Sequence, residues 1–308
     1  MYGIQAIPYC FRTLTPASSP DFVSSAWLSI ILTKWEKHRS GYLVILTFYD
    51  GLEYSLGVYA NFIFLSYVYG AFLKMDIQVV IITGGLATRL GELTKNRPKS
   101  MVEVLSRPFL AYQLELLKDQ EITDIVLCIG HLGTQIMEFF KDGSKYGVHI
   151  RYSVEDKLLG TAGALKNAEP MLDNIFFVMY GDSYLFLDFP KIYSYFISQN
   201  KLGLATVFKN HDLYDQSNMV INGNMVTKYN KVEKSNDVVY IDYGASIFKK
   251  EALQLIPEKH VYSLEDLFIR LIEKKQLLAF EVKDRFYEIG SPQGLKDFKV
   301  FSKRKLER

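Results

Sequence analysis

From residue 75 onward, short runs of apolar residues alternate with segments that repeat apolar residues at helical spacing. The short runs are rich in β-branched and aromatic residues, which predicts strands, whereas the longer segments predict amphipathic helices. Strands are predicted at 77–83, 124–129, 148–153, 175–180 and 203–208. Helices are predicted between them at 108–120, 133–141, 161–168 and 190–199. Strands that alternate with helices are typical of an α/β domain built on a mostly parallel sheet.

The order becomes less regular after residue 210. Two apolar runs, 219–221 and 225–229, are separated by Asn222-Gly223-Asn224, a sequence that favours the tight turn of a β-hairpin. A strand at 239–248, a helix at 263–274 and a strand at 277–282 are predicted to follow. Ser263 stands at the N-cap position of that helix, and Asp266 three residues later completes the form of a capping box.

Residues 1–74 differ in composition from the rest of the chain. They hold nine of the chain's 70 Asp, Glu, Lys and Arg residues but 16 of its 44 aromatic residues. Residues 54–73 carry no charge over 20 positions, about the length of one membrane-spanning helix. This run is nevertheless rich in aromatic and β-branched residues and contains glycine and asparagine. The N-terminus also lacks the basic stretch and apolar core of a signal peptide.

We therefore divide the chain into a hydrophobic, aromatic-rich extension of unknown role, residues 1–74, and a functional domain, residues 75–308. We expect the extension to lie outside the functional part of the protein, with Met75 as the natural start of translation. A single membrane anchor at 54–73 and a module that docks on a partner are the two alternatives. The sequence does not choose between them.

Composition excludes several classes of protein. Hydrophobic residues make up 49% of the 308 residues and charged residues 23%, values that are ordinary for a soluble globular protein. The formal net charge of +2 is too small to argue for a nucleic-acid partner. The two cysteines, Cys10 and Cys128, cannot build a disulfide framework or a thiolate zinc site, and Cys128 lies in an apolar run. Such cysteine usage fits a reducing compartment, and we expect a cytoplasmic location unless the extension is an anchor.

The strongest chemical signal follows the first predicted strand, in residues 79–101 (VVIITGGLATRLGELTKNRPKSM). The β-branched run leads into Gly84-Gly85, where the backbone can turn tightly and bring N–H groups close to an anion. Arg89 and Lys99 add two cations, of which arginine grips phosphate oxygens as a fork and lysine supplies a mobile point charge. The glycine spacing fits neither the dinucleotide fingerprint nor the Walker loop.

A second signal is an acidic residue at the end of a strand. Asp182 comes two residues after the apolar run 175–180, at the carboxyl edge where open α/β sheets bind their ligands. Packing explains a carboxylate poorly at this position. The surrounding Gly181-Asp182-Ser183 also lacks the Asp-x-Asp expected of a glycosyltransferase.

The run GGLATRLGELTKNRPKSM closely resembles the signature of the sugar-1-phosphate nucleotidyltransferases, GGxGTRLxxxTxxxPKxM. One position departs from it, because Ala87 stands where the signature has glycine. Further motifs of that family are matched in the same order by LGTAGA (159–164), Gly181-Asp182, Glu233-Lys234, YGASIF (243–248) and FYEIGSP (286–292). The resemblance covers Met75 to about Phe298. It implies a Rossmann-like nucleotide-diphospho-sugar transferase fold, in which helices flank a mixed, mostly parallel sheet, here with the extra N-terminal segment.

The resemblance also implies roles for individual residues. Catalytic roles fall on Arg89, Lys99 and Asp182. Nucleotide binding falls on Gly84, Gly85, Thr88, Gly160, Thr161 and Gly163. Sugar-phosphate binding falls on Gly181, Glu233, Lys234 and Gly244. Asp182 and Glu288 are the implied Mg²⁺ ligands, although Glu288 stands where the family has aspartate and so adds a methylene group to the ligand.

The implied reaction is Mg²⁺-dependent transfer of a nucleoside monophosphate from an NTP to a sugar-1-phosphate, which gives an NDP-sugar and pyrophosphate for the synthesis of cell-surface polysaccharide precursors. We expect GTP as donor and a hexose- or heptose-1-phosphate as acceptor, with uridine and thymidine nucleotides as alternatives. Two other functions stay open: a cytidylyltransferase acting on a polyol or lipid-head phosphate, and a non-catalytic regulator that binds nucleotide sugars. The sequence does not indicate an oligomeric state.

Overall fold

The computed structural model describes residues 76–85, 88–229, 237–258 and 261–307, except the side chains of 88, 89 and 306, and the backbone of 27–36 and 40–49. The chain divides into two units, Met1–Lys74 and Met75–Arg308. In the first unit, β1 (Trp27–Glu36) pairs antiparallel with β2 (Ser40–Tyr49). The run 54–73 lies outside the described residues. Within the described part of the chain, no helix has both the length and the apolar character needed to cross a membrane.

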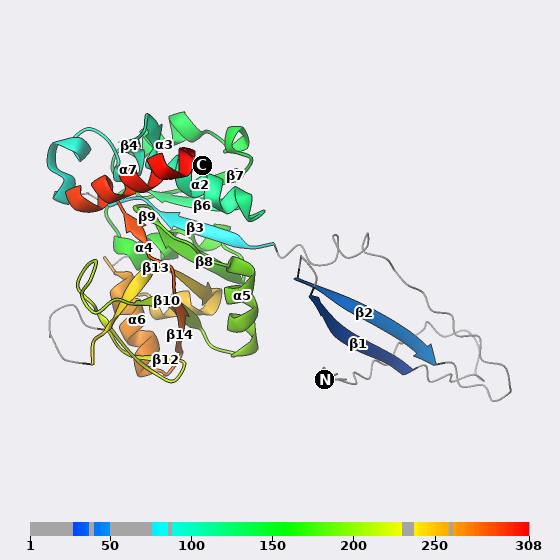
Figure 1. Ribbon diagram of the computed structural model, residues 1–308. Helices are drawn as coiled ribbons and strands as arrows, with labels where there is room; N and C mark the ends of the chain where they lie inside the picture. Colours follow the sequence, from blue (N-terminus) through cyan, green and yellow to red (C-terminus); the bar gives the residue numbers. More distant parts are fainter. Residues whose placement is uncertain are drawn as a thin grey trace, which may run out of the picture. The chain divides into compact units, whose positions relative to one another are not determined.

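The second unit is built on one nine-stranded sheet (Figure 1). Its strands are β3 (Gln78–Ile82), β6 (Asp124–Ile129), β7 (His149–Val154), β8 (Ile175–Tyr180), β10 (Gly203–Lys209), β11 (Met219–Asn222), β12 (Met225–Tyr229), β13 (Tyr240–Lys249) and β14 (Leu277–Val282). They lie in the order β10-β14-β12-β11-β13-β8-β3-β6-β7. The four strands β8, β3, β6 and β7 are parallel, and β13 joins them antiparallel to β8. The sheet is therefore mixed, with a parallel half that holds the first two motifs.

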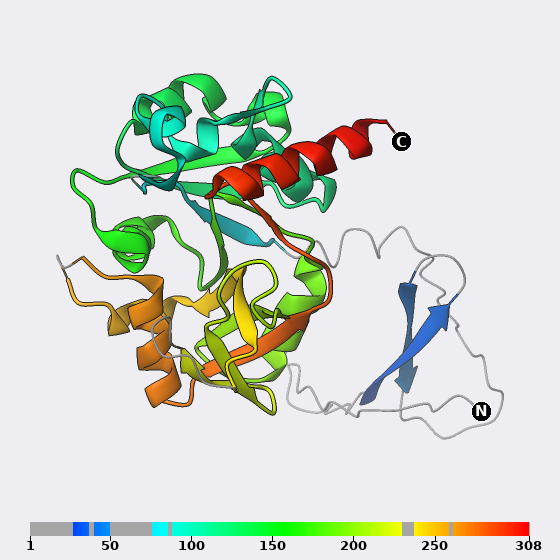
Figure 2. The same cartoon turned by 60° about the vertical axis from the view of Figure 1, so that its left-hand side comes forward.

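Helices cover both faces of this sheet (Figures 1 and 2). The helices are α2 (Phe109–Asp119), α3 (Gly133–Phe140), α4 (Gly160–Ala168), α5 (Phe189–Ser198), α6 (Leu264–Glu273) and α7 (Pro292–Leu306). Short 3₁₀ turns lie at η1 (Thr88–Thr94), η2 (Lys99–Met101), η3 (Ser144–Tyr146), η4 (Glu169–Met171) and η5 (Lys250–Leu255). Buried residues of α2, α3 and α5 share one core, and those of α4 and α6 share the other.

The alternation of side chains along β3 shows how one strand serves both cores. All five of its residues are buried. Val79 and Ile81 enter the core beneath α2, α3 and α5, whereas Val80 and Ile82 enter the core beneath α4 and α6. A strand that is buried on both faces reads as a continuous apolar run, as expected for the centre of a parallel sheet.

The regular elements agree with the sequence analysis, and most bounds differ by one residue or none. The α/β class, the hairpin of β11 and β12, and the N-cap of α6 at Ser263 are confirmed. The sequence analysis missed α7. It also missed two short antiparallel pairs: β4 (Glu103–Val104) with β5 (Arg107–Pro108), and β9 (Ser183–Tyr184) with β15 (Tyr287–Glu288). These strands have only two residues each, too few for an alternating pattern to appear.

Helix α7 packs over a third cluster of buried apolar residues. Phe298 makes edge-to-face contacts with Phe109 of α2 and Tyr112 of α2, with ring centroids 5.0 and 5.4 Å apart. Phe301 stacks on Tyr287 of β15, with centroids 4.5 Å apart. The helix thereby joins the end of the chain to α2 and to the short strand pair β9–β15. Its sequence signal was the Ser291-Pro292 start, followed by apolar residues at helical spacing.

The capping box of α6 predicts a measurable loss of stability in Ser263→Ala. The Ser263 hydroxyl accepts a hydrogen bond from the N–H of Asp266 at 3.1 Å, and the Asp266 carboxylate accepts one from the N–H of Ser263 at 3.0 Å. We expect the free energy of unfolding to fall by about 1 kcal/mol, which lowers Tm by about 2–4 °C in a domain of this size. Thermal unfolding followed by circular dichroism measures the change. Ser194→Ala, an exposed serine on α5, is the control, and an equal loss in both variants would contradict a capping role.

Candidate functional site

The first motif begins where β3 leaves the sheet. The backbone N–H and the side-chain hydroxyl of Thr83 both donate to the carbonyl of Cys128 on β6, each at 2.9 Å. The next residue, Gly84, lies against Glu155, because a Cβ at Gly84 would lie 2.7 Å from Oε1 of Glu155 and would require that side chain to move. The loop is therefore held against β6 and β7 at the carboxyl ends of the parallel strands. Leu86 and Ala87 lie outside the described residues, as do the side chains of Thr88 and Arg89.

The structure brings the first motif to the acidic residue after β8. Lys99 stands at the start of η2, and its Nζ lies 2.8 Å from Oδ2 of Asp182. Both side chains are largely covered, with relative exposures of 19% and 25%. An ion pair with limited access to water is stronger than one on the open surface. Two residues that the sequence separates by 83 positions are thus in direct contact at one edge of the sheet.

The turn that carries Asp182 is tied to its neighbours on both sides. The N–H of Gly181 donates to the carbonyl of Ile82 on β3 at 2.9 Å, and a Cβ at Gly181 would lie 2.6 Å from Cγ2 of Thr83. On the other side, the carbonyl of Asp182 accepts from the N–H of Ile289 at 2.9 Å. Asp182 thus lies between β3 and the strand that contributes Glu288.

Glu288 is close to Asp182 in the fold, but its carboxylate is engaged by the turn that starts α7. Glu288 pairs with Ser183 across β15 and β9. Its Oε2 accepts hydrogen bonds from the N–H groups of Gly290 and Ser291, the latter at 3.0 Å, and its Oε1 accepts from the Ser291 hydroxyl at 2.5 Å. In this arrangement the carboxylate stabilises the first turn of α7, where the helix dipole favours negative charge. No group of three or more His, Cys, Asp or Glu side chains in the described residues is placed to hold a metal ion.

The LGTAGA motif opens α4 as expected, but two of its N–H groups are already used. The N–H groups of Ala162 and Gly163 donate to the carbonyl of Tyr262, at 2.9 and 3.0 Å. Gly160 has φ +76°, and a Cβ there would lie 2.6 Å from the same carbonyl. The side chain of Thr161 accepts from the N–H of Leu264 at 2.7 Å. The N–H groups of residues 162 and 163 are therefore not free to bind an anion in this structure, because the segment before α6 occupies them.

Sequence reasoning missed Glu155, which stands between the two glycine motifs. Its N–H donates to the carbonyl of Ile129 at 2.9 Å, so it follows β7 at the same sheet edge. Its Oε2 accepts from the N–H of Leu159 at 3.1 Å, and its Oε1 lies against Gly84. Partial burial raises the pKa of the Glu155 carboxyl, and the hydrogen bond from Leu159 opposes this rise. An acidic residue directly after a predicted strand, at the carboxyl edge of the sheet as at Asp182, was the signal that could have found it.

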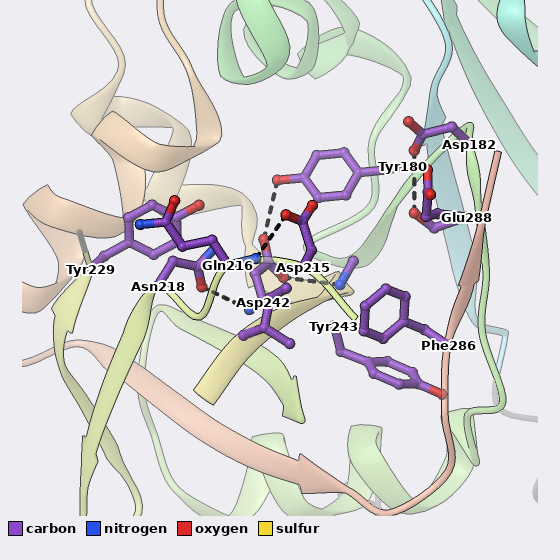
Figure 3. A pocket seen from close by; sticks show the side chains of 13 residues that line it. Tyr180, Asp182, Asp215, Gln216, Asn218, Tyr229, Asp242, Tyr243, Phe286 and Glu288 are labelled. Carbon is purple, nitrogen blue, oxygen red and sulfur yellow. Dashed lines mark hydrogen bonds between the residues drawn. The ribbon is translucent and has the colours of Figure 1, made fainter. Parts of the chain in front are cut away.

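A cavity of about 520 Å³ adjoins Asp182 (Figure 3). Asp182 and Glu288 lie toward one end of it, and Tyr229 and Asn218 toward the other. Its volume is within the range of small-molecule sites, about 300–1,000 Å³. Gly244 lines it with φ +101°, a conformation that favours glycine.

Asp242 forms a fixed acidic group in this cavity that the sequence analysis did not single out. Its Oδ1 accepts from the N–H of Gly244 at 3.0 Å, and its Oδ2 accepts from the Tyr180 hydroxyl at 3.3 Å. The N–H of Asp242 donates to the side-chain oxygen of Asn218 at 2.9 Å. Burial, with the negative charge of Asp242 nearby, raises the pKa of the Tyr180 hydroxyl, which therefore stays protonated as a donor. Glu233 and Lys234 lie outside the described residues.

Comparison with known proteins identifies the class to which this site belongs. The family model described as nucleotidyl transferase matches residues 78–304, and the chain belongs to this family. Its relatives are sugar-1-phosphate nucleotidyltransferases, and the chain is an enzyme of this type.

Two curated relatives and one solved structure illustrate the similarity. D-glycero-alpha-D-manno-heptose 1-phosphate guanylyltransferase of Campylobacter jejuni is 29% identical over 73% of this chain and 99% of its own length. Mannose-1-phosphate guanyltransferase of Saccharomyces cerevisiae is 33% identical over 71% of this chain, which spans 62% of the yeast protein. The crystal structure of HddC from Yersinia pseudotuberculosis complexed with GMP-PN is 25% identical, with a TM-score of 0.63, and the match covers 73% of this chain and 99% of that one.

The contacts of Gly181 predict that Gly181→Ala will disrupt the site. The added methyl group would collide with Thr83 and with the carbonyl of Ile82, so the turn must shift and carry Asp182 with it. We expect a stability loss of about 1–3 kcal/mol and turnover at least about tenfold lower, since small displacements at a reacting centre are costly. Urea unfolding and pyrophosphate release measure the two effects.

Gly223→Ala provides the matched control. Gly223 has φ +61° in the turn between β11 and β12, with open space around it, so alanine there strains only the backbone. We expect a similar loss of stability, about 1–2 kcal/mol, and unchanged turnover. Wild-type turnover in Gly181→Ala would show that the position of this turn does not matter for the reaction.

Proposed function

We propose that this enzyme transfers GMP from GTP to a hexose- or heptose-1-phosphate, giving a GDP-sugar and pyrophosphate. The observation that carries the proposal is the Lys99–Asp182 pair, which joins the first motif to a carboxylate that lines the 520 Å³ cavity. The choice of GTP as donor is supported by relatives that are named guanylyltransferase or guanyltransferase, and by the GMP-PN in the complex of a related protein. The acceptor class is supported by the same names.

In the proposed reaction, an oxygen of the sugar phosphate attacks the α-phosphorus of the nucleotide. A new P–O bond forms there, the bond to the β-phosphate bridging oxygen breaks, and pyrophosphate leaves with the electron pair. The attacking phosphate is already an anion near neutral pH, because its second pKa is about 6. The chain therefore has no need of a general base. Its task is to hold two polyanions in line and to stabilise the charge between them.

The proposed roles follow the positions of the motifs. Gly84 and Gly85, with Thr88 and Arg89, hold the triphosphate and the leaving pyrophosphate. Lys99 lies where it can turn from Asp182 toward the phosphates, so that its charge stays within the site during the reaction. The nucleotide is bound by Gly160, Thr161 and Gly163. The sugar phosphate is bound by Gly181, Gly244, Glu233 and Lys234.

The residues present fit a divalent cation of the Mg²⁺ type. Asp182 and Glu288 offer hard oxygen ligands from two paired strands, and Mg²⁺ commonly takes one or two carboxylates together with phosphate oxygens and water. When bound, such a cation would neutralise charge on the phosphates. In this structure Oδ2 of Asp182 contacts Lys99, and the Glu288 carboxylate accepts hydrogen bonds from Gly290 and Ser291, so a bound cation would compete with these contacts. We therefore propose Asp182 as the main ligand and Glu288 as the second.

We propose Glu155 as the group that selects guanine. No hydrogen bond to its Oε1 is found within the described part of the chain, and this oxygen lies against the Gly84 loop. A carboxylate is an acceptor with several lone pairs, which suits the adjacent N–H donors at the pairing edge of guanine. Uracil and thymine present a single N–H donor at the corresponding edge. A carboxylate held beside the nucleotide loops thus favours GTP over UTP.

Glu155→Gln tests this selection. The amide replaces one acceptor by a donor, so we expect the ratio of kcat/KM for GTP to that for UTP to fall about tenfold to a hundredfold, in line with the loss of one charge-assisted hydrogen bond of about 1.5–3 kcal/mol. Steady-state pyrophosphate release with each nucleotide measures the ratio. Burial raises the pKa of the Glu155 carboxyl, so ionisation of this group lowers the stability of the wild type as pH rises through that pKa. The neutral amide of Glu155→Gln avoids this loss, and the variant should therefore be no less stable than the wild type at pH 8. Glu138→Gln, on the exposed face of α3, is the control, and an unchanged ratio in Glu155→Gln would remove Glu155 from base selection.

The function itself is tested by pyrophosphate release across GTP, UTP, dTTP, CTP and ATP, each with mannose-, glucose- and heptose-1-phosphate and with a polyol phosphate. We expect turnover with GTP that requires Mg²⁺, and we expect Asp182→Asn to abolish it while Tm stays close to that of the wild type. Asp156→Asn, an exposed carboxylate after β7, is the control. Activity with CTP and a polyol phosphate alone would favour a cytidylyltransferase. Ligand binding without pyrophosphate release would favour a regulator.

Residues 1–74 are proposed to be dispensable for this chemistry. The family match begins at residue 78, after the extension. The same assay on a chain that starts at Met75 tests the proposal, and loss of turnover in a folded protein would assign the extension a part in the reaction. The membrane anchor and the docking module stay as alternative roles for this segment.

A further inference from the structure

One buried side chain outside the cavity contacts the turn that carries Asp182. Gln113 lies on α2 and is 1% exposed. Its Nε2 donates to the carbonyl of Tyr180 at 2.9 Å and to the carbonyl of Ser183 at 2.7 Å. These two carbonyls stand on either side of Gly181 and Asp182. A single side-chain amide therefore bridges the two ends of the turn.

This arrangement is unfavourable for the glutamine itself. Its Oε1 is buried and has no hydrogen-bond partner within the described residues. A buried acceptor without a partner lowers stability, and an apolar side chain of similar size would avoid that loss. The amide does, however, place both of its N–H groups on carbonyls of the turn, which an apolar side chain cannot do. Its orientation is settled by these two acceptors, since the flipped amide would direct its oxygen at both of them.

The other contacts of the turn hold one end each. The N–H of Gly181 bonds to β3, and the carbonyl of Asp182 bonds to the N–H of Ile289. Within the described part of the chain, no other side chain bonds to the carbonyls of both Tyr180 and Ser183. Gln113 is thus a single side chain that bonds to the backbone on both sides of Gly181 and Asp182.

We propose that Gln113 is a positioning residue for Asp182. By holding the carbonyls of residues 180 and 183 together, it fixes the backbone of the turn so that the carboxylate meets Lys99 on one side and the cavity on the other. Gln113 does not line the cavity and touches no substrate, so its effect passes entirely through the turn. The proposal rests on the function proposed for Asp182.

Gln113→Met in the full chain tests the proposal. Methionine keeps the length and volume of the side chain but removes both donors. We expect amide hydrogen exchange in residues 180–185 to be at least about tenfold faster, kcat to fall about tenfold to a hundredfold, and the Mg²⁺ concentration for half-maximal rate to rise. The KM for GTP should change little, since the nucleotide loops are not touched. Hydrogen exchange with mass spectrometry gives a readout that does not depend on activity.

Gln78→Met is the matched control. Gln78 is also 1% exposed, but it lies at the start of β3, at the opposite edge of the sheet, and donates to Asp124 at 2.9 Å. We expect it to lower Tm while leaving exchange in 180–185, kcat and the Mg²⁺ dependence of folded protein unchanged. Wild-type exchange or wild-type kcat in Gln113→Met would overturn the proposal. A wild-type protein without turnover would overturn the proposed function, whereas hydrogen exchange in residues 180–185 would still test the bridge made by Gln113, so the two failures are distinguishable.

A second variant covers the case in which Gln113→Met does not fold. Gln113→Glu keeps the shape of the side chain, and burial raises the pKa of the introduced carboxyl. The neutral acid can donate one hydrogen bond to the turn, whereas the ionised form repels both carbonyls. We expect kcat relative to wild type to fall as pH rises between about 6 and 8. A ratio of one across this range would overturn the proposal.

Discussion

The contact between Lys99 and Asp182 depends on the pairing of β3 with β8. Parallel neighbours end at the same edge of a sheet, so the loop after one strand and the turn after the other must meet there. An antiparallel arrangement would place the two motifs at opposite edges. The two-sided burial of β3 secures this pairing, because a slip of one residue would exchange the side chains that enter its two cores. The site thus rests on the register of the central strands.

The end of the chain completes the site from another direction. Strand β15 pairs with β9 beside Asp182, and α7 covers both through an aromatic cluster with α2. The carboxylate of Glu288 accepts hydrogen bonds at the start of α7, so one residue links this helix to the proposed metal position. Gln113 contacts the same turn from α2. Helices α2 and α7 therefore both contact the segments on either side of Asp182. Packing outside the cavity can in this way influence the geometry within it.

Hydrogen bonds also hold the start of α4, on the proposed nucleotide side of the site. The carbonyl of Tyr262, ahead of α6, accepts hydrogen bonds from the N–H groups of residues 162 and 163, and the Glu155 carboxylate accepts one from the N–H of Leu159. The start of α4 is consequently held by protein acceptors. For this reason we propose a side chain, Glu155, rather than the helix start alone, for recognition of the base.

The sequence by itself determined the α/β class, nearly every strand and helix of the central sheet, and the motifs at Gly84, Lys99 and Asp182, because these depend on local periodicity and on residue types close together in the chain. Only the tertiary structure decided which strands are neighbours, that Glu288 turns toward α7, and that Glu155, Asp242 and Gln113 reach the site. Two-residue strands carry no periodic signal, and a buried glutamine reads as an ordinary helix residue until its partners are known. Contacts between distant segments arise from the packing of the whole sheet, which no single stretch of sequence encodes.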